Sequence, residues 1–119
     1  MIDRDRRILR KINDYIQEAV GYIHGMTFDG FMQDRKTISA SAFCIGQIGE
    51  LAKEISDDTQ HANTAIPWNS IRGMRNKIVH DYKNIDFAVL WGTLTESLPE
   101  LERNIMKILS IEDDCGAGM

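Results

Sequence analysis

Between Asp3 and His24 the hydrophobic residues recur every three or four positions, which is the spacing of one face of an amphipathic helix. Asp3 and Asp5 lie near the start of this stretch, where negative charge suits the helix dipole. Gly25 is of the residue type that commonly ends helices. The sequence therefore predicts a first helix over about residues 3–24. Its apolar positions are Ile8, Leu9, Ile12, Tyr15, Ile16, Ala19, Val20 and Ile23.

The same spacing predicts a second helix over about residues 37–56, after a short helical turn within residues 27–36. Gly46 and Gly49 lie inside it, and each costs about 1 kcal/mol relative to alanine in a helix interior. We expect these glycines to serve close approach by another helix. The polar stretch that follows, residues 57–64, predicts a loop. The apolar positions of the second helix are Ile38, Ala42, Ile45, Ile48, Ala52 and Ile55.

A third helix is predicted from Pro67, a residue favoured at the first helical position, to about Tyr82. Ile71, Met74 and Ile78 should point inward from it. A fourth helix is predicted over about residues 86–109, with an unbroken heptad-like stripe. Pro99 lies inside this helix and should kink it, because an unrelieved proline costs about 3 kcal/mol in a helix interior. The stripe consists of Phe87, Trp91, Leu94, Leu98, Leu101, Ile105 and Ile108.

Four helices with short connections predict an all-α, up-and-down four-helix bundle. Almost no stretch has the alternation of a strand. We expect residues 1–111 to form one helical domain and residues 112–119 to form a flexible acidic tail. A chain of 119 residues is long enough to bury a core without disulfides, although an oligomer would add stability.

The composition limits the cellular compartments and the classes of partner that we expect for this protein. No apolar run approaches the roughly 20 residues that span a bilayer, and the charged N-terminus lacks the apolar stretch of a secretory signal. Cys44 and Cys115 are far apart in sequence, so we expect no disulfide framework and a reducing cytoplasm. A formal charge of −4 argues against a protein that coats nucleic acid by charge alone, but it leaves room for a local basic site.

Most familiar catalytic motifs are missing from the sequence. It contains neither glycine-rich phosphate-binding pattern, no His-Glu-x-x-His and no Gly-x-Ser-x-Gly. His24, His61 and His80 lack the spacing of zinc ligands, and Asp57 and Asp58 are best interpreted as solvated. We therefore expect no metal and no cofactor.

The predicted third helix carries the residues best suited to chemistry. Residues 71–83 hold four basic side chains against one acidic side chain, together with His80. An arginine fork binds phosphate oxygens, and histidine can transfer a proton near neutral pH. On a straight helix Arg75 and His80 lie roughly 140° apart, so one copy does not aim both at one point. Two copies around a two-fold axis could, which indicates a homodimer. The basic residues are Arg72, Arg75, Lys77 and Lys83.

A purely structural interpretation of this helix stays open at this point. A basic segment with one histidine is usually a solvated helix face. His80 lies near the predicted helix C-terminus, where a positive side chain interacts favourably with the helix dipole. Tyr82 falls on the apolar stripe of Ile71 and Ile78. The basic run in residues 4–11 has the same two interpretations, since it could contact phosphates or simply face solvent.

Arg75 followed by Asn76, then His80 and Tyr82, resembles the signature of HEPN domains of the HepT type. Its flanks match as well, and the resemblance covers about residues 3–110. The flanking residues are Ile48-Gly49-Glu50, Ile66-Pro67-Trp68, Gly73-Met74, Trp91 and Leu98-Pro99-x-Leu101.

This resemblance implies a homodimeric helical bundle whose motif helices meet in a cleft. It implies the toxin of a bacterial or archaeal toxin–antitoxin pair of type II or VII, a metal-independent endoribonuclease whose antitoxin is a minimal nucleotidyltransferase (MNT, or MntA). By that pattern Arg75 and His80 are catalytic, and Asn76 orients the phosphate or the His80 ring. From the local positive charge we also expect Arg72 to support phosphate positioning. Tyr82 would receive AMP from the antitoxin, which would silence the toxin by adding charge and bulk beside a basic cleft.

Two other functions compete with a ribonuclease. A non-catalytic HEPN module could bind nucleotide or RNA, or could regulate a nucleotidyltransferase, without cleaving anything. A dimeric scaffold would leave Arg75 and His80 freely replaceable. The presence of both residues favours the enzyme.

Overall fold

The computed structural model describes residues 1–79 and 84–117, with side chains described as far as residue 110. Within these residues, Val79 and Ile85 form an isolated antiparallel bridge and the regular elements are helical. In chain order they are α1 (Asp3–Tyr22), α2 (Phe28–Met32), α3 (Arg35–Lys53), α4 (Asp57–Ala62), α5 (Trp68–Arg72), α6 (Met74–Ile78), α7 (Phe87–Gly92), the π-helical segment η1 (Thr93–Ser97) and α8 (Leu98–Ala117).

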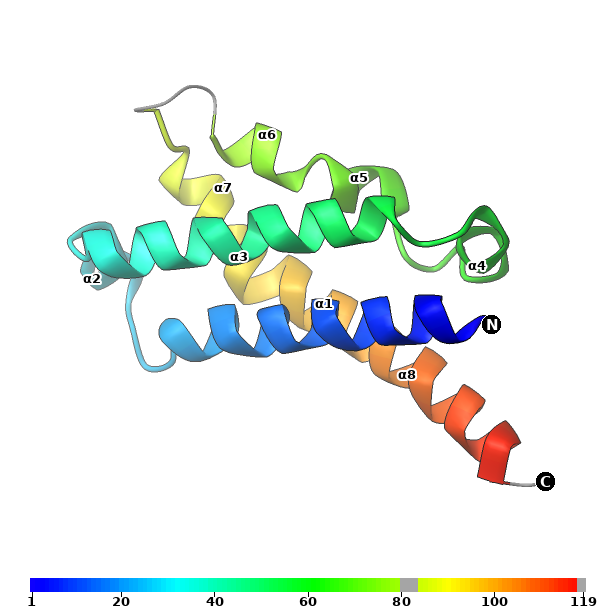
Figure 1. Cartoon of the computed structure of the whole chain (residues 1–119). Helices are drawn as coiled ribbons and strands as arrows, with labels where there is room; N and C mark the ends of the chain where they lie inside the picture. The colour runs from blue at the N-terminus through cyan, green and yellow to red at the C-terminus, as the bar shows by residue number, and fades with distance from the viewer. Residues whose placement is uncertain (80–83, 118–119) are drawn as a thin grey trace.

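The helices form four layers that run in alternating directions. In Figure 1 the first three lie side by side, and the fourth crosses them obliquely. The layers are α1, α3, the pair α5–α6, and the run α7–η1–α8, while the short helices α2 and α4 lie at opposite ends of α3. Helix α1 packs against both α3 and α8, and α3 also packs against α5 and α6. The predicted all-α four-helix bundle is confirmed.

The core forms where the predicted apolar faces meet. Leu9, Ile12 and Ile16 of α1 pack with Ile45 and Ile48 of α3, all at most 1% exposed. At about 25 cal/mol per Å² of apolar surface, burial of such side chains is the main stabilising contribution to the bundle. None of the helices in the described part of the chain combines the length and apolar character needed to cross a bilayer.

The fourth layer departs from its predicted stripe. The interruption expected at Pro99 takes the form of the π-helical segment η1, which ends directly before Leu98-Pro99. A π turn holds one residue more than an α turn, so the phase of the helix shifts across it. The prediction that Phe87 belongs to the buried stripe is wrong, whereas Trp91 is partly buried and packs against the core, with its ring centroid 5.1 Å from that of Phe31. Leu90 is fully buried instead, and Phe87 is 38% exposed.

The third layer is shorter and more broken than predicted. Gly73 separates α5 from α6, and α6 ends at Ile78 rather than near Tyr82. Val79 takes an extended conformation and pairs with Ile85, while the Asp86 N–H donates to the Ile78 carbonyl at 2.8 Å. The helical geometry assumed between Arg75 and residue 80 therefore does not apply. His80 and Tyr82 lie outside the described residues.

The prediction of a loop over residues 57–64 is also wrong in part, because Asp57–Ala62 form α4. Ser56 caps this helix, with its hydroxyl oxygen accepting from the Thr59 N–H at 3.4 Å. At the C-terminus the bounds of α8 extend to Ala117, beyond residue 111. The division into a domain and a flexible tail stays a prediction.

Asp5 links the first turn of α1 to α4. Its carboxylate is fully buried, and its Oδ1 accepts the Ser56 N–H at 3.1 Å. Its Oδ2 accepts the hydroxyls of Ser56 and Thr59, each at 2.5 Å. Burial alone would raise the pKa of Asp5, but the hydrogen bonds from Ser56 and Thr59 outweigh burial and hold the pKa below its ordinary value of 3.8.

Replacing Asp5 by alanine should lower the free energy of unfolding at neutral pH by about 2–3 kcal/mol, because it removes charge-assisted hydrogen bonds and leaves donors unpaired. The pKa of the folded state is lowered, so this stabilisation is present above pH 3.8 and is lost as the pH falls through the lower, folded-state value. Urea unfolding of both proteins across this range measures the difference.

Asp3→Ala is the matched control, since Asp3 is exposed and accepts a surface hydrogen bond from Arg6 at 3.0 Å. Its loss should stay below about 0.5 kcal/mol. An Asp5→Ala deficit that stays constant on acidification to pH 2 would contradict this account.

Candidate active site

Arg75, the central residue of the predicted site, lies on α6 and is exposed. Its side chain runs along α3 at Gly46, where an added Cβ would be 3.2 Å from Arg75 Cδ. One turn further along α3, a Cβ at Gly49 would be 3.3 Å from the Ile71 carbonyl oxygen. The two glycines thus bring α5–α6 close to α3, as the sequence predicts, and Gly46 also leaves the space that the arginine occupies.

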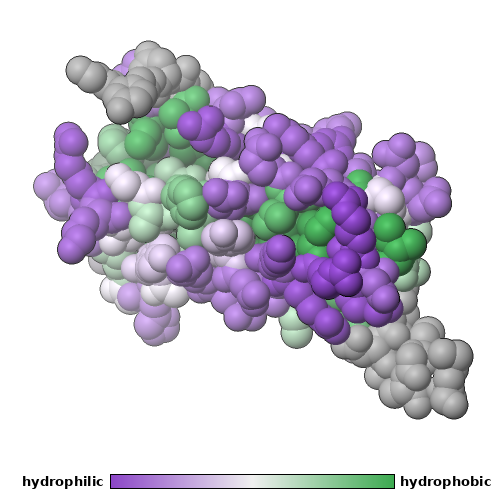
Figure 2. Space-filling model, in the orientation of Figure 1, coloured by the Kyte–Doolittle hydropathy of each residue, from purple (hydrophilic) through white to green (hydrophobic). Residues whose placement is uncertain are grey.

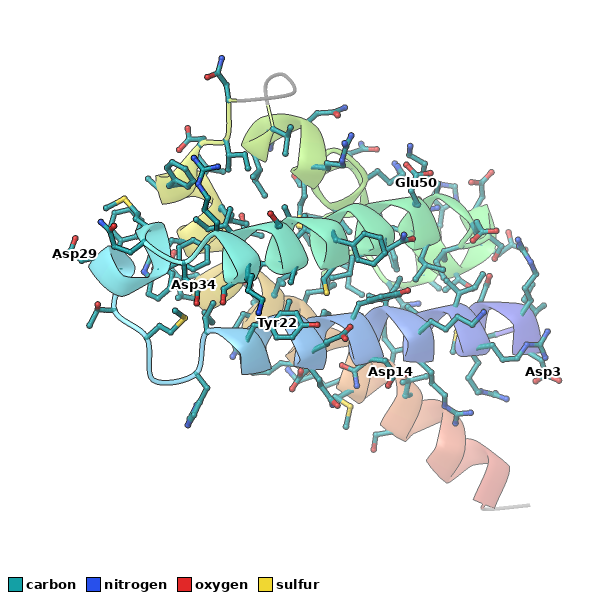
Figure 3. All side chains as sticks on the ribbon, turned by 60° about the vertical axis from the view of Figure 1, so that its left-hand side comes forward. Asp3, Asp14, Tyr22, Asp29, Asp34 and Glu50 are labelled. Atoms are coloured by element: carbon teal, nitrogen blue, oxygen red, sulfur yellow. The ribbon has the colours of Figure 1, made fainter. Side chains whose placement is uncertain are left out.

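Among the side chains that the structure describes, residues 1–79 and 84–110, no hydrogen bond or ion pair reaches the Arg75 guanidinium. It borders a surface hollow of about 470 Å³, which we call the Arg75 hollow. Glu50, a carboxylate in the same lining, is bonded to Lys53 at 2.9 Å and projects from α3 in Figure 3. The hollow is lined by Ser39, Ala42, Phe43, Gly46, Gln47, Glu50, Arg75, Val79 and Ile85.

Exposed apolar surface adjoins this arginine. Phe43 on α3 is 58% exposed and meets the ring of Tyr15 edge-on, with centroids 6.5 Å apart. Figure 2 shows apolar patches over α3 among hydrophilic side chains. An aromatic residue that lies off the apolar stripe of a helix is a signal that the sequence analysis missed.

Arg72 points away from the Arg75 hollow, toward α4. Its Nη1 donates to Gln60 Oε1 at 2.7 Å, and its Nη2 donates to the Asn69 amide oxygen. It borders a separate hollow of about 630 Å³, the Arg72 hollow. The two hollows share no lining residue, so the structure does not bring Arg72 and Arg75 together. The Arg72 hollow is lined by Asp57, Gln60, His61, Thr64, Ile66, Pro67, Trp68, Asn69, Ser70 and Arg72.

The other predicted site residues are divided between described and undescribed parts of the chain. Asn76 follows Arg75 on α6 and is exposed. His80 and Tyr82 are not described, so their positions relative to Arg75 stay a prediction. Gln60 and Asn69, which hold Arg72, were not singled out from the sequence, and Gln60 reaches Arg72 only because α4 packs beside α5.

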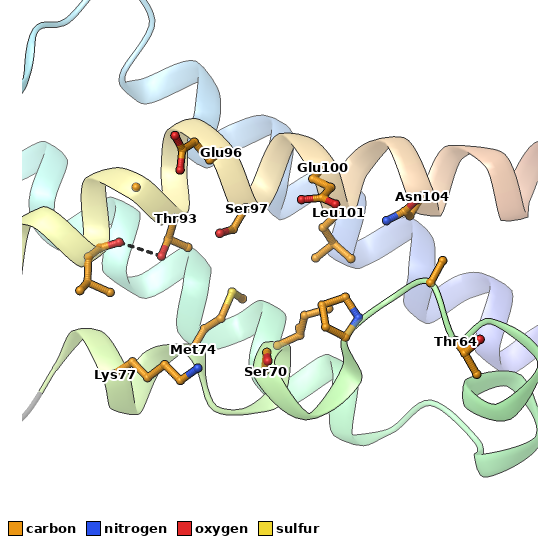
Figure 4. A pocket seen from close by; sticks show the side chains of 15 residues that line it. Thr64, Ser70, Met74, Lys77, Thr93, Glu96, Ser97, Glu100, Leu101 and Asn104 are labelled. Carbon is orange, nitrogen blue, oxygen red and sulfur yellow. Dashed lines mark hydrogen bonds between the residues drawn. The ribbon is translucent and has the colours of Figure 1, made fainter.

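A third hollow, of about 480 Å³, separates α5–α6 from η1 and α8 (Figure 4). Glu96 and Glu100 stand on the η1–α8 wall, and Lys77 stands on the opposite wall (Figure 4). Two carboxylates against one ammonium make this hollow less suited to phosphate than the Arg75 hollow.

One polar cluster joins α1 to α3 on another part of the surface. Glu18 accepts the Tyr22 hydroxyl at 2.9 Å and the Cys44 thiol at 3.6 Å, and Figure 3 shows Tyr22 between the two helices. Burial and the adjacent Glu18 raise the pKa of the Cys44 thiol to about 11. The thiol is therefore protonated at neutral pH and is no nucleophile. Among the described residues, no group of three His, Cys, Asp or Glu side chains could hold a metal ion.

Comparison with known proteins agrees with this geometry. A family model described as Ribonuclease HepT-like matches residues 12–108. A protein of Thermococcus cleftensis named a probable ribonuclease HepT is 34% identical over 106 residues, which cover 83% of this chain and 96% of that protein. A candidate RNase of Caldanaerobacter subterraneus subsp. tengcongensis is 30% identical over 107 residues, which cover 90% of this chain and 96% of that protein.

A third relative, a candidate RNase of Methanocaldococcus jannaschii, is 27% identical over 104 residues, which cover 87% of this chain and 86% of that protein. No solved structure matches the chain. The family model spans most of the four-helix bundle and includes the segment that carries the exposed Arg75. The chain therefore belongs to the HepT-like ribonuclease family of HEPN domains.

Proposed function

We propose that this protein is the toxin of a toxin–antitoxin pair, a metal-independent endoribonuclease that acts in the cytoplasm. The observation that carries the proposal is the exposed Arg75, whose charge no described residue neutralises and which stands in the motif of a ribonuclease family. A guanidinium that no described residue pairs, beside a hollow, is suited to a phosphate that gains negative charge during reaction.

The proposed reaction uses groups of the substrate and of this chain. The ribose 2′-hydroxyl attacks the adjacent phosphorus, and the bond from phosphorus to the 5′ oxygen breaks. The products are a 2′,3′-cyclic phosphate and a 5′-hydroxyl. His80 acts as general base or general acid in this step, and the proton that the 2′-hydroxyl loses is balanced by the proton that the leaving 5′ oxygen gains. Arg75 stabilises the charge on the phosphorane oxygens, and Asn76 orients the phosphate.

A homodimer would complete this site. Phe43, which is 58% exposed, lines the same hollow as Arg75, and aromatic and arginine side chains are enriched at interface centres. A two-fold axis through this hollow would bring Arg75 and His80 of both copies to one cleft.

The proposed control of this activity lies at Tyr82. A minimal nucleotidyltransferase antitoxin would transfer AMP to its hydroxyl, with release of pyrophosphate from ATP. The added phosphate is negative and bulky, so it would repel and block RNA beside Arg75. Mass spectrometry of protein co-expressed with such an antitoxin would show AMP on Tyr82, and a Tyr82 that stays unmodified in the presence of active antitoxin counts against this control.

The test of the ribonuclease itself is a cleavage assay in excess chelator, with mass spectrometry of the products. We expect 2′,3′-cyclic phosphate ends made by the purified dimer. Tight RNA or nucleotide binding with no turnover would instead identify a non-catalytic module and would end the proposal.

A further inference from the structure

Arg72 is held in place but is not neutralised. Gln60 and Asn69, its two described hydrogen-bond partners, are neutral amides, and no carboxylate pairs with it among the described residues. The amides fix the direction of the fork while the full positive charge stays available. Its side chain is partly exposed, so an anion can reach it from the Arg72 hollow.

The lining of the Arg72 hollow suits a sugar-phosphate group. The imidazole of His61, the amide of Asn69 and the hydroxyl of Ser70 add hydrogen-bonding groups beside the arginine. Asp57 is the only carboxylate in the described lining, and it lies in the first turn of α4, where the helix dipole favours it. Side chains of these types make most contacts to nucleic-acid backbones.

The position of this hollow relates it to the proposed cleavage site. Arg72 and Arg75 belong to the same short segment, on either side of the Gly73 turn. Their side chains enter different hollows, so they cannot grasp the same phosphate. A strand that places one phosphate at Arg75 can place another one beside Arg72.

We propose that the Arg72 hollow is a second phosphate subsite, which binds a backbone phosphate of the RNA strand next to the one that is cleaved. This subsite rests on the proposed ribonuclease function for its substrate. Arg72 would therefore increase the affinity for RNA strands long enough to reach it, while Arg75 would act on the phosphate that is cleaved.

The test compares substrates of different length. A chimeric strand with one ribonucleotide at a mapped cleavage position is lengthened one deoxynucleotide at a time on either side. Arg72→Gln should raise KM about tenfold for the longer strands, at nearly unchanged kcat, and should leave the shortest cleaved strand unaffected. Arg72→Lys keeps the charge without the fork and should lose less. Arg103→Gln, at an exposed arginine of α8, removes the same charge elsewhere and should change KM little.

A direct binding assay keeps the subsite testable apart from catalysis. Anisotropy with 2′-O-methyl RNA, which lacks the attacking hydroxyl, should show weaker binding to Arg72→Gln and a salt slope smaller by about 1. Melting temperatures establish that each variant is folded. Equal losses for short and long strands, or equal losses for Arg72→Gln and Arg103→Gln, would overturn the subsite. If the wild-type protein cleaves nothing, the ribonuclease proposal fails, and the anisotropy result still decides whether Arg72 binds RNA.

Discussion

Arg75→Ala is expected to lower kcat for RNA cleavage by about 100- to 1,000-fold, because it removes the fork that stabilises charge on the phosphorane oxygens. The melting temperature should change little, since the Arg75 side chain is exposed and makes no hydrogen bond or ion pair with a described residue. Single-turnover cleavage of a labelled RNA measures the effect apart from binding. Arg75→Lys should recover only part of the rate, because an ammonium cannot make the bidentate contact.

The companion variant His80→Ala tests whether the two residues act together. Residues that serve one chemical step lose far less in combination than the product of their separate losses. Arg75→Ala, His80→Ala and the double variant should therefore have similar residual rates. A variant without Arg75 that cleaves as fast as the wild type would remove this arginine from the mechanism.

Phe43→Asp is expected to convert the proposed dimer to a monomer and to abolish cleavage with it. Burial of an aromatic side chain contributes about 2 kcal/mol, and a two-fold interface buries two copies, so the dimer should weaken about 1,000-fold. The monomer should stay folded, because Phe43 is 58% exposed in the single chain. Sedimentation velocity gives the association state, and the cleavage assay gives the activity of the same samples.

Ile2→Asp provides the matched control. Ile2 is 56% exposed and occupies the N-cap of α1, where it makes no side-chain hydrogen bond. An aspartate is favoured at that position, so this variant should stay dimeric and active. A dimer that survives Phe43→Asp, or one that is lost equally with Ile2→Asp, would contradict the proposed interface.

The fold was largely predictable because the apolar spacing is regular in α1, α3 and α8. Ile12, Ile48 and Ile105 are buried where their helical period places them. The failures have local causes. Ser56 followed by two aspartates is a capping signal that predicts α4, and it was overlooked. Leu90 is fully buried in place of Trp91 because of a π turn, which a count of α-helical periodicity does not include.

The site was predictable only as far as its residues are neighbours in sequence. The motif identified Arg75 as the candidate, and its exposure agrees with that role. The direction of Arg72 depends on Gln60, twelve residues earlier and on another helix, so no reasoning along the chain could give it. The burial of Asp5 likewise depends on Ser56 and Thr59, more than fifty residues away.

The contrast between the two arginines affects how each would meet an anion. Two amides already restrict the rotamers of Arg72, so little conformational entropy is left for it to lose on contact. Arg75 is packed beside Gly46, and no described residue holds it by a hydrogen bond or ion pair. Ordering such a long side chain costs up to about 2 kcal/mol. The loss of side-chain entropy accompanies ligand binding. A correctly positioned RNA strand makes enough contacts to offset this loss, whereas a weakly bound strand does not. A hydrogen bond that held Arg75 in place before binding would raise its affinity for any anion. It would also reduce the difference in affinity between a correctly and an incorrectly positioned RNA strand.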